Sequence, residues 1–281
     1  MIELKNVSKC YGNEAVLKDI SLSIEKNGIY CLLGRNGAGK TTLLKSIAGH
    51  RKITEGQIRI NGKRISPSSL ESDVCYIENW AKHFNLPVGK LLRTAAGING
   101  DYDYEFSLEM MERFELDGKK KFNQLSLGMK TMVSTIISLS SSKSVILLDE
   151  PVLGFDAVMR MEFYELLKES YSRHPRIIIV STHIIEEIES SIDRLIIIDK
   201  GRLIFSDTLE AVSSSAFTVS GLQEDVEKAV EGKKVLARDI KGGLECAYIF
   251  GTPPTSPSIR AEKMTLLDFF ICLTAKGGKR K

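Results

Sequence analysis

Cysteine is scarce in this chain, and its placement excludes a disulfide or zinc framework. The five cysteines are Cys10, Cys31, Cys75, Cys246 and Cys272. Their number is odd, no Cys-x-x-Cys pair occurs, and three of them lie inside apolar, strand-like segments. Paired or zinc-binding cysteines usually show regular, close spacing. We therefore expect reduced, buried thiols in a cytosolic protein.

Long apolar runs are also missing. The longest, at 176–180 and 194–198, have the length of a strand, whereas a helix that crosses a membrane needs about 20 apolar residues. The N-terminal segment MIELKNVSK alternates polar and apolar residues and lacks the apolar centre of a signal peptide. The chain is therefore predicted not to span a membrane, although it could dock on a protein that does.

A large net charge of either sign is absent as well. The formal net charge is +3 over 281 residues, and the tail GGKRK at 277–281 is a short basic cluster. This charge is too small to indicate a nucleic-acid partner. With 43% hydrophobic and 27% charged residues, the composition is that of a globular protein with one large domain and a small one, or two medium domains.

Apolar segments of strand length alternate with helical patterns through the middle of the chain. These segments are 29–33, 144–148, 176–180 and 194–198. Fully apolar strands between helices are typical of a mainly parallel sheet covered on both faces. The first part of the chain instead shows alternating strands with turns at Tyr11–Asn13 and at Asn61 and Gly62. We therefore expect an antiparallel β subdomain beside the parallel core.

Strand patterns disappear between about residues 80 and 143. Three helical segments, LPVGKLLRTAAG, SLEMMERFEL and LGMKTMVSTIISLSSS, follow one another there, which predicts an all-helical insert. The composition shifts again at 213–215. We therefore predict an α/β protein with a large domain at 1–212, whose helical subdomain covers about 80–143, and a small α+β domain at 213–281.

The expected small domain reads as strand, helix, strand and strand, followed by a loop rich in Pro, Ser and Thr. An amphipathic helix, EKMTLLDFFICLT, comes last. Its apolar stripe is formed by Met264, Leu267, Phe270 and Ile271. We interpret the stripe as ordinary core, with a partner contact as the alternative.

The segment GRNGAGKT fits the pattern G-x-x-x-x-G-K-[ST], between an apolar strand and a helix as that motif requires. The glycines let backbone N–H groups wrap a phosphate, Lys40 reaches the β- and γ-phosphates, and the Thr41 hydroxyl can bind Mg²⁺. The motif predicts a P-loop NTPase core. The expected nucleotide contacts are Gly34, Asn36, Gly37, Ala38, Gly39, Lys40, Thr41 and Thr42.

In two further segments an apolar strand is followed directly by polar residues. VILLDEP ends in Asp149, which suits the Mg²⁺ shell, and Glu150, which can accept a proton from an attacking water or orient it. STHIIEEIE places His183 at the carboxyl end of another strand, where ligands gather in such sheets. The guanine-reading pattern N-K-x-D is absent, which argues against a GTPase.

The segment QLSLGMK combines a serine and a glycine at the expected start of a helix. Ser126 there can simply cap the helix. The same arrangement also exposes backbone N–H groups to an anion. The residues alone leave both interpretations open.

Taken together, the P-loop, QLSLGMK, VILLDEPVLGFDA and VSTH, in this order and spacing, resemble the ATPase subunit of ATP-binding cassette (ABC) transporters over residues 1 to about 210. The resemblance implies Mg²⁺-dependent hydrolysis of ATP, with Glu150 as the catalytic glutamate, His183 as the switch histidine and Lys40 on the phosphates. It implies that Tyr11 stacks on adenine. The other implied contacts to ATP are Ser126 and Gly128, from the signature motif, and Asp156, from the loop that links two ATP sites.

The resemblance also implies an assembly. Two ATPase subunits, identical or different, form a head-to-tail dimer in which each ATP lies between the P-loop of one subunit and the signature helix of the other. The insert at about 80–121 docks on an integral membrane subunit, so the chain is peripheral at the cytoplasmic face of the cell membrane. A single cassette with a short C-terminal extension resembles the ATPases of bacterial exporters.

The sequence departs from the family pattern at two places. Glu78 stands where the family has a Gln that helps to bind Mg²⁺, with Asn79 as a less favoured alignment; a carboxylate can still bind Mg²⁺ but adds negative charge near the γ-phosphate. Leu127 and Met129 replace a Gly and a Gln of the signature. Because the signature acts on the partner's ATP, these changes affect different sites, and we expect an active but tuned ATPase.

Two alternatives stay open. One is an ABC-type ATPase that is not coupled to transport; the single cassette and the lack of a long coiled coil argue against the translation and repair members of that class. The other is a nucleotide-binding regulatory subunit with little turnover. The presence of Lys40, Asp149, Glu150 and His183 argues against it, whereas Glu78 and Leu127 keep it open.

Overall fold

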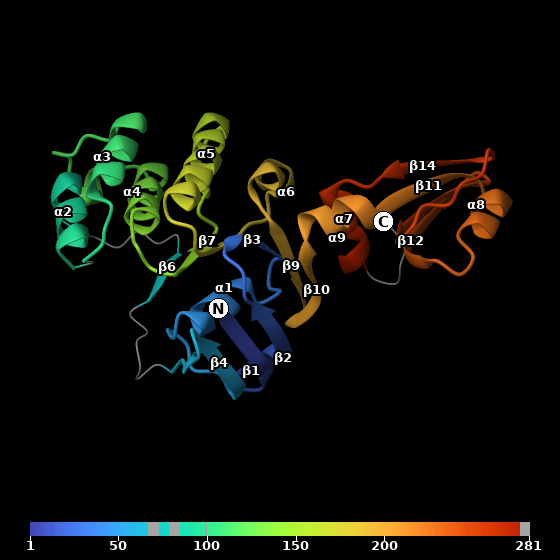
Figure 1. Ribbon diagram of the computed structural model, residues 1–281, viewed down its shortest axis with the longest axis horizontal. Coiled ribbons are helices and arrows are strands. Elements are labelled where there is room, and N and C mark those ends of the chain that lie inside the picture. Colours follow the sequence, from blue (N-terminus) through green and yellow to red (C-terminus); the bar gives the residue numbers. More distant parts are fainter. Residues whose placement is uncertain (67–72, 79–84, 99, 276–281) are drawn as a thin grey trace. The chain divides into compact units, whose positions relative to one another are not determined.

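The computed structural model describes residues 1–66, 73–78, 85–98 and 100–275 (Figure 1). The chain divides into two compact units, one formed by 1–192 with 198–203 and the other by 193–197 with 204–281. The domain boundary expected between 212 and 213 falls inside helix α7 (Leu209–Ser215), and it stays a prediction. None of the helices in the described ranges is both long and apolar enough to cross a bilayer.

The first strands form the expected antiparallel layer, in the order β2-β1-β4-β5. Their bounds are Ile2–Tyr11 for β1, Glu14–Ile24 for β2, Glu55–Ile60 for β4 and Lys63–Arg64 for β5. The hairpin between β4 and β5 turns through Asn61 and Gly62, both with positive φ, which is the backbone that an Asn-Gly turn supplies.

A second sheet has the order β10-β9-β3-β8-β7-β6, and β3, β8, β7 and β6 run parallel. The bounds are Gly28–Leu33 for β3, Val74–Glu78 for β6, Val145–Asp149 for β7, Ile177–Ser181 for β8, Arg194–Asp199 for β9 and Arg202–Thr208 for β10. Every residue of β3, β7 and β8 is buried, as expected of strands covered on both faces. The α/β class predicted from the sequence is confirmed.

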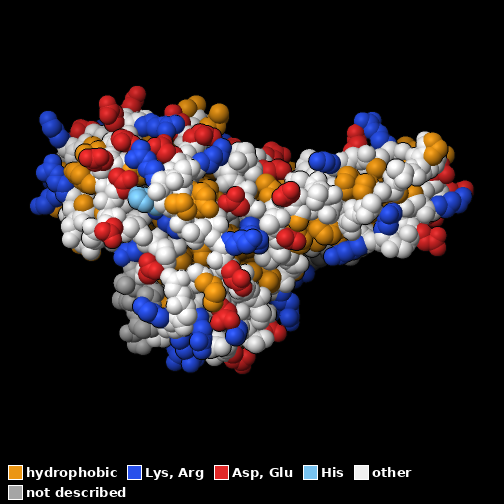
Figure 2. Space-filling view, viewed as in Figure 1, with side chains coloured by type: hydrophobic (Ala, Val, Ile, Leu, Met, Phe, Trp, Pro, Cys, Tyr) orange, Lys and Arg blue, Asp and Glu red, His pale blue; other side chains and the backbone are white. Residues whose placement is uncertain are grey.

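The helices and turns in the described part of the insert include no strand, and its helices α2, α3 and α4 lie together in Figure 1. Acidic and basic side chains are interspersed over this part of the surface in Figure 2. Its elements are α2 (Val88–Ile98), α3 (Tyr104–Arg113), the 3₁₀ turn η1 (Phe122–Gln124) and α4 (Leu127–Leu139). The start expected near residue 80 lies outside the described residues.

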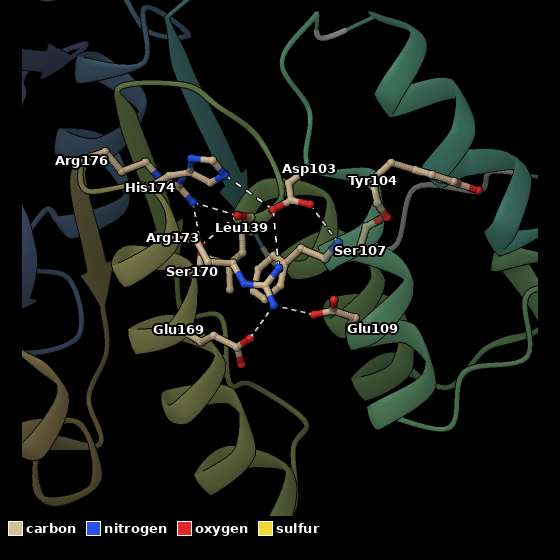
Figure 3. A network of polar contacts seen from close by, with 11 residues as sticks. Asp103, Tyr104, Ser107, Glu109, Leu139, Glu169, Ser170, Arg173, His174 and Arg176 are labelled. Atoms are coloured by element: carbon tan, nitrogen blue, oxygen red, sulfur yellow. Dashed lines mark hydrogen bonds and ion pairs between the residues drawn. The ribbon is translucent and has the colours of Figure 1, made fainter.

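A network of polar contacts joins the insert to α5 (Ala157–Arg173), the long helix that follows β7 (Figure 3). The Arg173 guanidinium contacts the carboxylates of Glu109 at 2.6 Å and Glu169 at 3.0 Å, and it lies 4.4 Å from the ring centre of Phe106. A guanidinium that lies over an aromatic ring as well as beside carboxylates is held more firmly than one in an exposed ion pair alone. Arg173 therefore fixes α3 against α5.

Arg176, beside this network, is buried at the start of β8. Its Nη2 donates to the Leu139 carbonyl at 2.8 Å and to Ser170 Oγ at 2.6 Å, while its Nε and Nη1 find no hydrogen-bond partner in the described part of the chain. Burial lowers the pKa of Arg176 to about 10, because removal from water penalises the charged form.

The second unit carries an antiparallel sheet in the order β12-β13-β11-β14. Its elements are α7, β11 (Ala216–Leu222), α8 (Gln223–Ala229), β12 (Lys234–Lys241), β13 (Leu244–Phe250), β14 (Ile259–Lys263) and α9 (Leu266–Thr274). Val226 and Val230 of the α8 segment pack with Val219, Ala247 and Ile249 in a small core. This confirms the expected small α+β unit.

The C-terminal helix begins later than predicted. Residues 259–263 pair with β11 as strand β14, and Thr265 caps α9 by accepting a hydrogen bond from the Asp268 N–H at 3.1 Å. The buried face of α9 contains Leu266, Phe269 and Cys272. Of the stripe predicted as core, Met264 is buried, whereas Leu267, Phe270 and Ile271 are only half-buried.

Candidate nucleotide site

The P-loop connects β3 to α1 (Lys40–Ile47). Gly37 and Gly39 have φ of 80° and 104°, values that side chains rarely tolerate. A Cβ atom at Gly34 would lie 2.7 Å from the Ile198 carbonyl oxygen, and one at Gly39 would lie 2.9 Å from Leu17 Cδ2. The loop conformation therefore depends on these three glycines, as a phosphate cradle requires.

The side chains of the loop differ in exposure. Asn36 and Thr41 are exposed, Thr42 is half-buried and Ala38 is buried. Lys40 is buried, and its Nζ donates to the Gly34 carbonyl at 2.8 Å. An ammonium has three N–H donors, so this bond leaves Lys40 able to bind an anion at the start of α1.

Lys40, Glu150 and His183 come together at the carboxyl ends of β3, β7 and β8. Glu150 Oε1 lies 3.8 Å from Lys40 Nζ, and Glu150 Oε2 lies 2.8 Å from His183 Nδ1. Glu150 has a φ of 51°, an uncommon backbone for a residue other than glycine. Its carboxylate therefore lies between a cation and an imidazole, where it can accept a proton from a bound water.

Asp149 ends β7 and is 6% exposed. Its Oδ1 accepts from Ser181 Oγ at 2.5 Å and its Oδ2 from Tyr76 Oη at 3.3 Å. Glu78 is the register neighbour of Asp149 in β6, and the alternative Asn79 lies outside the described residues.

The Asp149 carboxylate and the Thr41 hydroxyl are oxygen ligands of the kind that Mg²⁺ prefers. A carboxylate oxygen retains lone-pair capacity after one hydrogen bond, so Asp149 and the exposed Thr41 hydroxyl fit a magnesium shell. Within the described ranges, His, Cys, Asp and Glu form no group of three that could hold a metal alone. Mg²⁺ at such a site typically takes its remaining ligands from phosphates and water.

A second group of predicted residues meets around Gly154. Ser126 caps α4 by accepting from the Met129 N–H at 3.2 Å, so its capping role is confirmed. A Cβ atom at Gly128 would lie 2.8 Å from the Gly154 carbonyl oxygen. Asp156 caps α5 by accepting from the Met159 N–H at 2.9 Å. The signature segment and the loop before α5 therefore pack directly on one another.

Tyr11 stands apart at the end of β1. Its side chain is 45% exposed, and Lys9 Nζ lies 4.9 Å from the ring centre. An exposed aromatic face beside a cation suits stacking on a planar, electron-rich base. No contact links Tyr11 to the Glu150 cluster among the hydrogen bonds and ion pairs of the described residues.

The structure adds residues that the sequence patterns did not single out. Ser181 and Tyr76 bond to Asp149. Arg160 Nε donates to Glu187 Oε2 at 2.7 Å, and Arg160 Nη1 donates to the Phe155 carbonyl at 2.9 Å. The sequence offered one signal for these contacts. Ser181 is a polar residue at the end of a buried strand, directly before Thr182 and His183, and a buried polar side chain needs a hydrogen-bond partner.

Comparison with known sequences identifies the chain's relatives. The family model described as ABC transporter matches residues 17–153. The ABC transporter ATP-binding protein YtrB of Bacillus subtilis is 34% identical over 69% of this chain and 68% of its own length. The lantibiotic transport ATP-binding protein SrtF of Streptococcus pyogenes is 31% identical over 73% and 89%. An iron(III) import ATP-binding protein of Pectobacterium atrosepticum is 30% identical over 72% and 59%.

The fold comparison agrees with the sequence comparison. A solved structure described as the ATP binding subunit of an ABC transporter superposes with a TM-score of 0.67 and 27% identity, over 75% of this chain and 91% of that one. The family-model match includes the P-loop, the strand β7 that ends in Asp149, and Glu150 directly after it. The chain belongs to the ATP-binding subunits of ABC transporters, whose cassette hydrolyses ATP to drive transport.

Proposed function

We propose that this chain is the Mg²⁺-dependent ATPase subunit of an exporter, and that it works as a dimer beneath a separate membrane subunit. The observation that carries the proposal is the cluster of Lys40, Glu150 and His183, with Glu150 Oε2 2.8 Å from His183 Nδ1. A carboxylate held in this way has the placement of a general base.

In this proposal the P-loop binds the phosphates and Tyr11 stacks on the adenine. Backbone N–H groups at Gly37 and Gly39 surround the phosphates, and Lys40 neutralises the charge that develops on the γ-phosphoryl oxygens. Asn36, Ala38 and Thr42 contribute further contacts from the loop and the first turn of α1. The glycine geometry of the loop supports this role.

Glu150 orients the attacking water or accepts its proton, and His183 fixes the Glu150 carboxylate while it hydrogen-bonds the γ-phosphate. Asp149, Thr41 and Glu78 would hold Mg²⁺, which would offset the negative charge of the phosphates. The position of Asp149 at the end of β7, beside Glu78 in the strand register, supports this assignment. Each residue thus has a separate role at one edge of the parallel sheet.

The signature segment acts on a partner subunit. Ser126 and Gly128 present a capped helix start to the γ-phosphate of the partner's ATP, and Asp156 joins the two sites. The side chains of Leu127 and Leu153 are each 49% exposed. Their exposure supports a protein interface at this surface, because a dimer contact would remove these apolar side chains from water. The partner is a second copy or a related ATPase subunit.

Export through an integral membrane subunit completes the proposal, and it places the chain at the cytoplasmic face of the membrane. The support is a relative named for lantibiotic transport. A relative named for iron import makes direction the first point to test. Uptake of substrate into inside-out vesicles that contain both subunits indicates export, and uptake only into right-side-out vesicles contradicts it.

The ATPase assignment is tested with the purified chain and its E150Q variant. We expect wild-type hydrolysis to depend on Mg²⁺ and on protein concentration, and E150Q to be slower by a factor of roughly 10² or more. Equal rates at high protein concentration would contradict the self-sufficient dimer. Recovery in the membrane fraction only on co-expression of the membrane subunit supports coupling to transport; recovery as a soluble protein in both cases favours the uncoupled ATPase.

A further inference from the structure

The Asp149 carboxylate is held from both sides by hydroxyl groups of the neighbouring strands. Ser181 on β8 donates to Oδ1 at 2.5 Å, and Tyr76 on β6 donates to Oδ2 at 3.3 Å. The strand order β8-β7-β6 makes this possible. On β8 the register partner of Asp149 is Ser181. On β6 the register partner is Glu78, and Tyr76 lies two positions before it. Each oxygen of the carboxylate therefore has its own donor.

Ser181 contacts the next acidic residue as well. The Glu150 N–H donates to Ser181 Oγ and to the Ser181 carbonyl, each at 3.1 Å. These two bonds hold the backbone of Glu150 at its positive φ of 51°, which costs energy unless surrounding contacts fix it. One fully buried hydroxyl therefore sets both the Asp149 carboxylate and the turn that aims the Glu150 side chain.

Tyr76 is positioned by a different contact. Its ring packs edge-on against His50, with 5.3 Å between the ring centres, and His50 follows the end of α1. The ring orientation that results carries the hydroxyl to Asp149. This chain of contacts runs from the P-loop helix to β6 and then to β7, so it does not depend on Ser181.

The need for two donors follows from the burial of the charge. The Asp149 residue is 6% exposed, and Glu150 follows it directly in the chain. A buried carboxylate is costly unless hydrogen bonds replace those that it would make to water. Hydrogen bonds from hydroxyl groups stabilise its negative charge and fix its orientation.

We propose that Ser181 and Tyr76 are positioning residues for Mg²⁺-ATP hydrolysis, with Ser181 as the main one. The two hydroxyls hold the Asp149 carboxylate in the orientation that binds Mg²⁺, and Ser181 also fixes the turn that carries Glu150. This inference rests on the proposed function, because it assigns Asp149 to the magnesium shell. It goes further in naming what keeps that shell in place.

The experiment compares four variants: S181A, S181T, Y76F and, as a matched control, S170A. Ser170 is as fully buried as Ser181, and it bonds to the Leu139 carbonyl and to Arg176 rather than to the site. Two quantities are measured for each variant. One is the Mg²⁺ concentration that gives half-maximal hydrolysis, and the other is the affinity for Mn²⁺ in the presence of ATP, measured by electron paramagnetic resonance on E150Q backgrounds.

We expect S181A to weaken the affinity for Mg²⁺ and Mn²⁺ by roughly 10-fold, the loss typical when a partner of a metal ligand is removed. Y76F should show a smaller loss, because its hydrogen bond is longer. S181T retains the hydroxyl and should stay within about 2-fold of wild type, since a β-branched side chain suits a strand. S170A should lower the melting temperature and leave both metal affinities unchanged.

The results separate this inference from the proposed function. Mg²⁺-independent hydrolysis by wild type, or no hydrolysis, overturns the proposed function. Mg²⁺-dependent wild-type hydrolysis with an unchanged metal affinity in S181A overturns the inference alone. The inference also fails if S181T loses affinity as S181A does while both melt as wild type does, or if S170A and S181A lose metal affinity equally.

Discussion

The Nδ1 atom of His183 lies 2.8 Å from Oε2 of Glu150, and this contact joins the segment after β8 to the residue that follows β7. Both side chains remain accessible, with His183 54% and Glu150 24% exposed. A ligand can therefore reach the pair without rearrangement of the sheet. The Glu150 carboxylate of this pair also lies 3.8 Å from the Lys40 ammonium.

Substitution of His183 tests this relationship. We expect H183A to lower kcat by roughly 10² or more, the range seen when a group that acts on proton transfer or charge is lost. KM for ATP should change little, because in the proposed function the P-loop and Tyr11 bind the nucleotide. The rate is measured at saturating Mg²⁺-ATP. A large rise in KM with an unchanged kcat would show that His183 only binds.

Restoring the signature tests the action of Leu127 and Met129 on a partner subunit. We expect L127G with M129Q to raise hydrolysis at the other subunit's P-loop, because glycine lets backbone approach the phosphate. The experiment uses mixed dimers in which one subunit carries K40A, so that one ATP site works. The restored signature is placed first in the K40A subunit and then in the other.

The expected increase appears only when the K40A subunit carries the restored signature. An equal increase in both arrangements would show that the substitutions act through folding or dimer affinity. An increase only in the other arrangement would show that the signature serves its own subunit. Stoichiometric mixing of differently tagged chains provides the control for dimer composition.

The sequence predicted the layers and the P-loop well because both follow from local patterns. β3, β7 and β8 are continuous apolar runs between helical segments, and such runs identify buried parallel strands. The glycines at Gly37 and Gly39 take the left-handed backbone that their motif requires. Local periodicity and glycine spacing thus carry most of this fold.

Contacts between strands could not be predicted in the same way. The bond from Ser181 to Asp149 depends on the register of β8 against β7, and a register is set by packing across the whole sheet. The late start of α9 has a similar cause. Pairing of 259–263 with β11 overrides the helical periodicity that began near Glu262.

Gly128 should tolerate no side chain. A Cβ atom there would lie 2.8 Å from the Gly154 carbonyl oxygen, so G128A forces backbone to move and should cost about 1–3 kcal/mol of unfolding free energy. The matched control is G97A, at a helical position with open space around it, which should gain up to about 1 kcal/mol. Urea unfolding measures both variants, and equal effects would contradict the close packing.

Arg160 should couple the loop before α5 to the segment after His183. Its guanidinium donates to the Phe155 carbonyl and to the Glu187 carboxylate, and the hydrogen bond to Glu187 raises the pKa of Arg160. Because both side chains of the ion pair are partly exposed, 23% and 33%, the pair itself should contribute little to the unfolding free energy. The bond to the Phe155 carbonyl is the one that restrains the Asp156 loop.

We therefore expect R160A to slow hydrolysis by the dimer several-fold more than E187A does, because only R160A releases the loop. A double-mutant cycle on the unfolding free energy should give only a weak coupling between Arg160 and Glu187. Hydrolysis is measured on the same proteins at equal dimer concentration. Equal rates for R160A and E187A would show that the ion pair, and not the bond to the Phe155 carbonyl, holds the Asp156 loop.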